Sequence, residues 1–140
     1  MTELGDDVVA FLSEGTRTAK LGYVARDGRP LVAPVWFYVD GNQLVFNTGR
    51  DTAKGRALQR DPRVVVCVDD ERPPFSFVQI QGEATLGEDP AELLETATRL
   101  GGRYMGADRA EEYGRRNGVP GELVVRVTPT KVITAFNLAD

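Results

Sequence analysis

Two Asp-Gly turns, at Asp27-Gly28 and Asp40-Gly41, constrain the fold of this chain more than any other feature. Each follows a run that reads as a strand: residues 18–26 alternate apolar and polar side chains, and residues 31–39 are almost wholly apolar. Asp-Gly between such runs is typical of a tight β-hairpin, whose turn geometry requires the positive φ that glycine accepts. We therefore expect the first three strands to be antiparallel neighbours, which argues against a doubly wound parallel sheet.

The rest of the chain continues a mainly β pattern. Asp89-Pro90 has the cap and first-turn proline of a helix start, and we expect Gly101-Gly102 to end that helix. Gly82 marks a bend or a close backbone approach within its strand. Roughly six or seven strands with a few short helices favour a closed or partly closed antiparallel β-barrel. The other predicted elements are helices over 6–14 and 108–116 and strands over 43–48, 63–69, 75–86, 122–128 and 131–136.

The apolar run 31–39 needs cover on both faces, because it lacks the alternation of a half-exposed strand. Pro34 cannot donate to a sheet ladder, so we expect this strand at an edge or a bulge. A chain of 140 residues is long enough for one domain with a real core, and we expect a single domain over residues 1–140. Part of the cover on the apolar strand should then come from a second subunit.

Composition argues against several function classes. The net charge of −4 is unlike that of a general nucleic-acid binder, and no apolar run is long enough to cross a bilayer. The acidic N-terminus lacks the pattern of a signal peptide, so we expect a cytoplasmic protein. Cys67 stands among valines and reads as a small buried hydrophobe. The acids at 69–71 read as a solvated loop.

The chain contains no histidine, which removes most zinc sites and histidine-based catalysis. We therefore assign no metal ligand and no catalytic side chain. If the protein is an enzyme, a cofactor carries its chemistry.

Residues 47–63 form a candidate anion site. A strand ends there, and Gly49 permits a sharp turn because it has no Cβ. Asp51 or Thr52 can cap the helix that follows, and Pro62 disfavours helical geometry at the residue before it. The free N–H groups and the dipole at such a helix N-terminus attract a negative charge.

Three cations, Arg50, Lys54 and Arg56, surround this predicted helix start. They favour a phosphate as the anion, while a basic helix that is merely solvated remains the alternative. The segment has no Gly-Lys-Ser/Thr run and no G-x-G-x-x-G, which argues against a nucleotide-fold phosphate loop.

The order of these features resembles the split β-barrel flavin and deazaflavin oxidoreductases, the pyridoxamine 5′-phosphate oxidase-like superfamily. The resemblance spans about residues 18–136, and its most specific parts are residues 54–64, Lys-Gly-Arg-Ala-Leu-Gln-Arg-Asp-Pro-Arg-Val, and the Gln81-Gly-Glu-Ala strand. Asp27-Gly-Arg-Pro and Pro34-Val-Trp-Phe-Tyr also fit. The branch that looks most similar is the actinobacterial enzymes that use coenzyme F-420.

The resemblance implies an FMN-binding split-barrel fold and a homodimer with cofactor clefts between the subunits. It implies hydride transfer between reduced coenzyme F-420 and an electron-poor small molecule, such as a conjugated enone or a quinone. It places the phosphate end of the cofactor at Asn47, Thr48, Arg50, Lys54 and Arg56. It places the tricyclic ring along Pro34, Val35 and Trp36.

Several alternatives stay open. FMN would suit the same helix, but the first strand lacks the basic, leucine-rich pattern of pyridoxamine phosphate oxidases, and histidine is absent. A non-catalytic flavin, deazaflavin or heme-type binding module on the same barrel is the rival function. Trp36 reads either as a core residue or as a stacking platform. Arg103 and Tyr104, after the Gly-Gly pair, read as a solvated loop that could also reach a partner or the cofactor tail.

Overall fold

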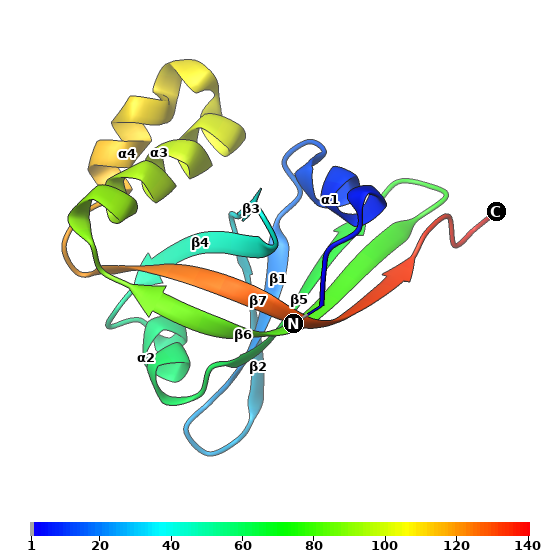
Figure 1. The fold of residues 1–140 in the computed structure, drawn as a ribbon, viewed down its shortest axis with the longest axis horizontal. Coiled ribbons are helices and arrows are strands. Elements are labelled where there is room, and N and C mark those ends of the chain that lie inside the picture. The colour runs from blue at the N-terminus through cyan, green and yellow to red at the C-terminus, as the bar shows by residue number, and fades with distance from the viewer. Residues whose placement is uncertain (1) are drawn as a thin grey trace.

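The computed structural model describes residues 2–140, whose centre is a curled seven-stranded antiparallel sheet (Figure 1). This arrangement confirms the predicted mainly β, split-barrel class. The sheet order is β2-β1-β5-β6-β7-β4-β3. The strands are β1 (Ala19–Val24), β2 (Pro30–Val35), β3 (Tyr38–Asp40), β4 (Gln43–Gly49), β5 (Arg63–Asp70), β6 (Ser76–Gly87) and β7 (Glu122–Ala135). The helices are α1 (Asp6–Ser13), α2 (Ala53–Arg60), α3 (Pro90–Met105) and α4 (Ala110–Asn117), with a 3-10 turn, η1, at Ala107–Arg109.

The two edges of the sheet are joined by a very short connection. β2 and β3 lie at opposite ends of the strand order, yet only Trp36 and Phe37 separate them in sequence. The edges must therefore approach each other at this point, which rolls the sheet into a partly closed barrel. The prediction of one continuous strand over 31–39 is wrong here, because the chain leaves one edge and enters the other.

Side chains from α3 replace the sheet partners of this connection. The hydroxyl of Tyr104 accepts the Phe37 N–H at 3.2 Å, and the Arg103 guanidinium donates to the Phe37 carbonyl at 2.6 Å. Phe37 itself is fully buried in the barrel. A buried backbone group needs a hydrogen-bond partner, so these two side chains make the break in the strand possible.

The barrel encloses the main hydrophobic core. Alternate residues of the strands point inward, and α1 and α2 contribute Val8, Leu12 and Leu58 to this core. A second apolar cluster lies outside the barrel, where α3 covers β3, β4 and β7. In Figure 1, α3 and α4 form a helical pair on this side of the sheet. The second cluster consists of Tyr38, Val45, Leu93, Leu100 and Val124, with Trp36 and Tyr104 packed against it.

Gly82 marks the bend that the sequence predicts. The register between β6 and β7 shifts between Gln81 and Gly82, and a Cβ at Gly82 would lie 2.5 Å from the Thr128 carbonyl oxygen. Only glycine permits that approach. β7 continues through Pro129 as one long strand and follows β6 around the bend.

The prediction that Gly101-Gly102 ends a helix is wrong. The helix starts as expected, with the Asp89 carboxylate accepting the Glu92 N–H at 3.0 Å, but α3 continues to Met105. A Cβ at Gly101 would lie 2.5 Å from the Cβ of Tyr113 on α4. The glycine is therefore a point of close helix packing. Tertiary contact here outweighs the low helix propensity of glycine.

Composition also raised the questions of whether Cys67 is buried and whether a segment spans a membrane. Cys67 lies on the outer face of β5 and is only partly buried, so the prediction of a buried core thiol is wrong. Burial nevertheless raises the pKa of the Cys67 thiol, with a smaller contribution from Asp69, so the unreactive thiol form is favoured. Among the helices of residues 2–140, none combines the length and apolar character needed to cross a membrane.

Candidate cofactor site

The turn between β4 and α2 is closed by one threonine. The Thr52 hydroxyl accepts the Gly55 N–H at 3.1 Å and donates to the Gly49 carbonyl at 2.7 Å. Thr52, and not Asp51, is thus the N-cap of α2. The first helical hydrogen bond runs from Arg56 N–H to the Thr52 carbonyl at 2.9 Å. The N–H groups of residues 53 and 54 precede that bond and can serve an anion.

The three predicted cations differ in their surroundings. Lys54 is partly buried and Arg56 is exposed, and within residues 2–140 neither forms an ion pair. The Arg50 guanidinium lies 2.8 Å from the carboxylate of Glu88 in the loop before α3. Within the described residues, Lys54 and Arg56 are therefore available to a ligand, whereas Arg50 already pairs with a carboxylate.

Asn47 and Thr48 point to opposite faces of β4. The Asn47 amide faces outward and donates to the Glu122 carboxylate at 3.3 Å and to the Asn117 carbonyl at 3.5 Å. Thr48 faces the barrel interior, is 6% exposed, and its hydroxyl lies 3.4 Å from that of Thr52. The Thr48 side chain therefore supports the α2 cap. Only its backbone is placed to meet a ligand outside the barrel.

Two carboxylates flank the outer side of this turn, and sequence reasoning did not include them. Glu88 and Glu122 line a cavity of about 170 Å³ together with Pro90, Leu93, Gly118, Pro120 and Gly121. Burial raises the pKa of the Glu122 carboxyl above its ordinary value. Glu122 reaches the turn because it pairs with Gly49 across β4 and β7. No local pattern in the sequence signals that pairing.

The residues predicted to line the cofactor ring also divide between the two faces. Val35 points into the core and is 8% exposed, whereas Pro34 is exposed on the outer face. Trp36 is partly buried, and its indole stacks on the Tyr104 ring with centroids 5.0 Å apart and planes at 3°. The Trp36 ring thus belongs to the outer apolar cluster and also reaches the surface. Both sequence interpretations of Trp36, core residue and platform, fit this position.

Arg103 and Tyr104 do not lie in a solvated loop, contrary to the prediction. Both lie in the last turn of α3 and are about half-buried. Burial lowers the pKa of the Arg103 guanidinium and raises the pKa of the Tyr104 hydroxyl. No local pattern signals their contacts, because these depend on α3 continuing past the glycine pair.

An apolar surface covers the outer face of β1, β2 and β5. Val32 is 70% exposed and Ile133, farther across the sheet, is 37% exposed. A shallow cavity of about 330 Å³ lies there, lined by Lys20, Gly22, Pro30, Leu31, Val32, Val65, Cys67 and Gln79. Large exposed apolar side chains on a sheet face are typical of an interaction surface.

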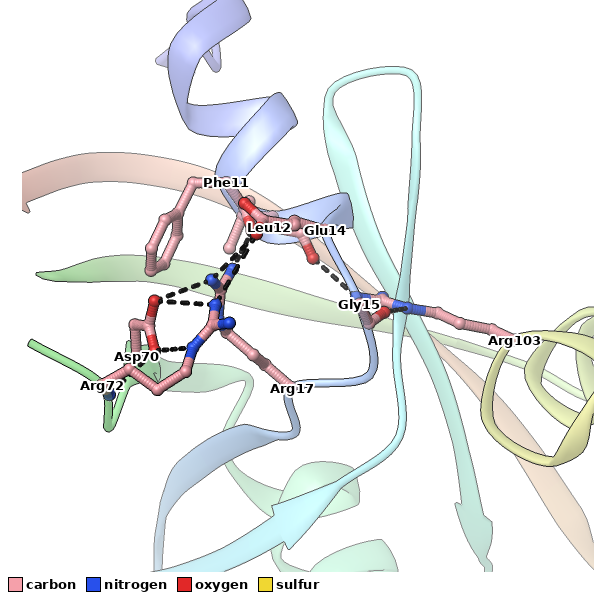
Figure 2. A network of polar contacts seen from close by, with 8 residues as sticks. All are labelled: Phe11, Leu12, Glu14, Gly15, Arg17, Asp70, Arg72 and Arg103. Atoms are coloured by element: carbon pink, nitrogen blue, oxygen red, sulfur yellow. Dashed lines mark hydrogen bonds and ion pairs between the residues drawn. The ribbon is translucent and has the colours of Figure 1, made fainter. Parts of the chain in front are cut away.

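A larger cavity of about 510 Å³ lies elsewhere, between the loop after α1 and the loop after β5 (Figure 2). Most of its charged groups form ion pairs with one another. Arg17 pairs with Asp70 at 3.1 Å, Arg72 pairs with Asp70 at 3.1 Å, and Lys20 pairs with Asp69 at 2.9 Å. Matched charges stabilise the loops, and we do not place the cofactor in this cavity.

The family model for pyridoxamine 5′-phosphate oxidase matches residues 4–136. This chain belongs to the pyridoxamine 5′-phosphate oxidase family. That family generally binds flavins. No curated protein matches the chain.

Solved structures similar to this family member carry different descriptions. A conserved hypothetical protein from Mycobacterium tuberculosis has a TM-score of 0.81 at 20% identity, over 98% of this chain and 91% of that one. An F-420 reductase has a TM-score of 0.69 at 26% identity, over 87% and 93%. The heme storage protein HutZ from Vibrio cholerae has a TM-score of 0.74 at 18% identity, over 99% and 100%. The fold is thus shared by proteins of unlike function.

The residues at the β4–α2 turn fit the anionic end of a flavin-type cofactor. A capped helix start offers backbone N–H groups, and Lys54 and Arg56 supply positive charge without internal partners among residues 2–140. An aromatic side chain that a planar ring can contact, Trp36, lies apart from this turn, near the C-terminal end of α3, where its indole stacks on Tyr104. Anionic and aromatic contacts together are what a phosphate-bearing tricycle requires.

Proposed function

We propose that this member of the family is a coenzyme F-420-dependent oxidoreductase that acts on an electron-poor small organic substrate. The observation that carries the proposal is the capped N-terminus of α2, with the N–H groups of residues 53 and 54 open and Lys54 in the first turn. The 26% identity to an F-420 reductase supports the choice of cofactor. The first strand lacks the pattern typical of FMN-dependent pyridoxamine phosphate oxidases.

Each side of the proposed site has a separate task. Lys54, Arg56 and the open N–H groups hold the phosphate, joined by Arg50 once it leaves Glu88. Pro34 and Trp36 line the ring through their side chains, whereas Val35 can do so only through its backbone. At the phosphate end, Thr48 can contact the cofactor only through its backbone, because its side chain is buried. The cofactor, when bound, supplies hydride chemistry. The protein binds it, orients it and excludes water from it.

We also propose that two copies pair through the outer face of β1, β2 and β5, with the clefts at their interface. The apolar surface around Val32 supports this pairing, because one chain alone leaves it in water. Light scattering at micromolar concentration should give the mass of a dimer. Val32→Glu should shift the protein to a monomer, since it would bury a charge at the interface. A wild-type monomer at that concentration would exclude the pairing.

Fluorescence titration tests the cofactor. We expect coenzyme F-420 to bind more tightly than FMN, in the oxidised or the reduced form. Tight FMN binding with no F-420 binding would favour the flavin alternative. A panel of enones and quinones then tests turnover. A protein that binds reduced F-420 tightly but oxidises it with no acceptor would be a carrier and not an enzyme.

A further inference from the structure

One arginine at the end of α3 ties three separate segments of the chain together. The Arg103 guanidinium donates to the carbonyls of Leu12 at 2.7 Å, Gly15 at 3.1 Å and Phe37 at 2.6 Å. Figure 2 shows this side chain reaching from α3 to the loop that follows α1. The guanidinium also lies over the rings of Phe37 and Tyr104, 4.7 and 5.1 Å from their centroids. The planar fork of arginine suits several fixed acceptors at once.

The neighbouring tyrosine uses its hydroxyl on the same connection. The Tyr104 hydroxyl accepts the Phe37 N–H at 3.2 Å and donates to the Arg17 carbonyl at 2.8 Å. Its ring meanwhile lies parallel to the indole of Trp36. Together Arg103 and Tyr104 satisfy both backbone groups of Phe37 and contact the side chain of the residue before it.

We propose that Tyr104 and Arg103 are positioning residues that fix the Trp36 indole as one wall of the cofactor-ring cleft. Trp36 lies in a two-residue connection outside the sheet ladder, so strand pairing does not set its orientation. The stacked Tyr104 ring sets the plane of the indole. The hydrogen bonds to the Phe37 backbone hold the main chain next to Trp36, and so the position of its Cα. A preorganised wall binds a planar ring more tightly, because less side-chain freedom is lost on binding. The role of Trp36 toward the ring rests on the function proposed above.

The chain contains one tryptophan, so Trp36 reports on its own order. Tyr104→Phe keeps the stacked ring and removes the hydroxyl. We expect acrylamide quenching of Trp36 emission to rise measurably in this variant without any cofactor. We expect the dissociation constant of the cofactor that the wild type binds to rise about fivefold, because a less ordered indole loses more side-chain freedom on binding. Arg103→Lys keeps the charge but cannot reach three carbonyls at once, and it should act in the same direction.

Tyr113→Phe is the matched control, because Tyr113 packs against the same indole at 6.0 Å and 59° from the neighbouring helix. It should change neither quenching nor affinity. If Tyr104→Phe lowers only the thermal midpoint, while quenching and affinity of the folded protein stay at wild-type values, the residue is merely structural and the inference fails. If the wild type binds neither coenzyme F-420 nor FMN, the proposed function fails. The quenching comparison still decides whether Tyr104 and Arg103 order Trp36.

Discussion

The Arg50 guanidinium and the Glu88 carboxylate form an ion pair, at 2.8 Å, where the proposed phosphate site begins. Both side chains are 51% exposed, and such surface pairs contribute about 0–1 kcal/mol. A phosphate that engages Arg50 meets Glu88 at the same guanidinium, so the carboxylate competes with the ligand. Glu88→Gln should therefore strengthen cofactor binding, by up to about fivefold.

Fluorescence titration of the cofactor measures the effect of Glu88→Gln. Glu95→Gln is the control, because it removes the same charge from an exposed position on α3. An equal gain in both variants would mean that only the overall charge matters. An unchanged affinity in Glu88→Gln would show that Arg50 does not bind the anion.

Lys54 is the residue on which the phosphate site most depends. Its ammonium is in the first turn of α2 and has no ion-pair partner within residues 2–140. A charge-assisted hydrogen bond contributes roughly 1.5–3 kcal/mol, so Lys54→Ala should weaken cofactor binding about ten- to a hundredfold. The free energy of unfolding should change by about 0.5 kcal/mol or less, as for most surface substitutions.

Arg26→Ala is the control for Lys54→Ala, because it removes one positive charge just beyond the end of β1. A similar loss of affinity in the control would indicate long-range charge and not a contact. If Lys54→Ala, Arg50→Ala and Arg56→Ala all bind the cofactor as tightly as wild type, the α2 N-terminus is not the phosphate site.

Asp70 links the stability of the protein to acid pH. Hydrogen bonds from Arg72, with a smaller effect of Arg17, lower the pKa of Asp70 to about 2. A carboxyl with a lowered folded-state pKa stabilises the fold above its unfolded pKa, and this stabilisation is lost as pH falls through the folded value. Asp70→Asn should thus be less stable than wild type at neutral pH. Its stability should also fall less steeply between about pH 4 and pH 2.

Urea unfolding at a series of pH values tests the Asp70 prediction. Glu71→Gln, at the exposed neighbouring position, should retain the wild-type slope. Parallel curves for Asp70→Asn and wild type across this acid range would show that other carboxyls control acid unfolding.

The sequence predicts those parts of the fold that local chemistry decides. Asp27-Gly28 and Asp40-Gly41 do join antiparallel strands, Thr52 and Asp89 do cap helices, and Gly82 does mark the bend. Each depends on a turn, a cap or a backbone approach that a few neighbouring residues determine.

The features that the sequence could not predict depend on residues far apart in the chain. The strand break at Phe37 depends on hydrogen bonds from α3, about 66 residues away. The ion pair of Arg50 with Glu88 and the contact of Asn47 with Glu122 depend on how β4, β7 and α3 meet. The apolar run 31–39 also reads as one strand, because nothing in its composition marks the point where the chain leaves the exposed face of β2, where Val32 is 70% exposed, for the buried Phe37 and Tyr38.

Substitution of Gly101 tests whether this glycine packs α3 against α4 or ends the helix, as its sequence context suggests. Ala is favoured over Gly inside a helix by about 1 kcal/mol, so an exposed site would gain stability from Gly101→Ala. Here the new Cβ would lie 2.5 Å from the Tyr113 Cβ, which is attached to the α4 backbone and cannot rotate away. The two helices would have to separate, and such overpacking costs about 1–3 kcal/mol. We therefore expect Gly101→Ala to lower the free energy of unfolding in urea.

Gly102→Ala is the matched control for this substitution. Its Cβ would meet the Ala110 Cβ at 3.4 Å, an ordinary contact, so the helix-propensity gain of up to about 1 kcal/mol should remain. Both variants make the same change, Gly to Ala, in the same helix. If the free energy of unfolding falls in Gly101→Ala and rises in Gly102→Ala, the steric contact with Tyr113, and not helix propensity, decides the effect at Gly101. Tyr113 also packs against Trp36, so Gly101→Ala should increase acrylamide quenching of Trp36 while Gly102→Ala does not. If Gly101→Ala stabilises the protein as much as Gly102→Ala does, α3 and α4 do not pack as closely as the structure shows.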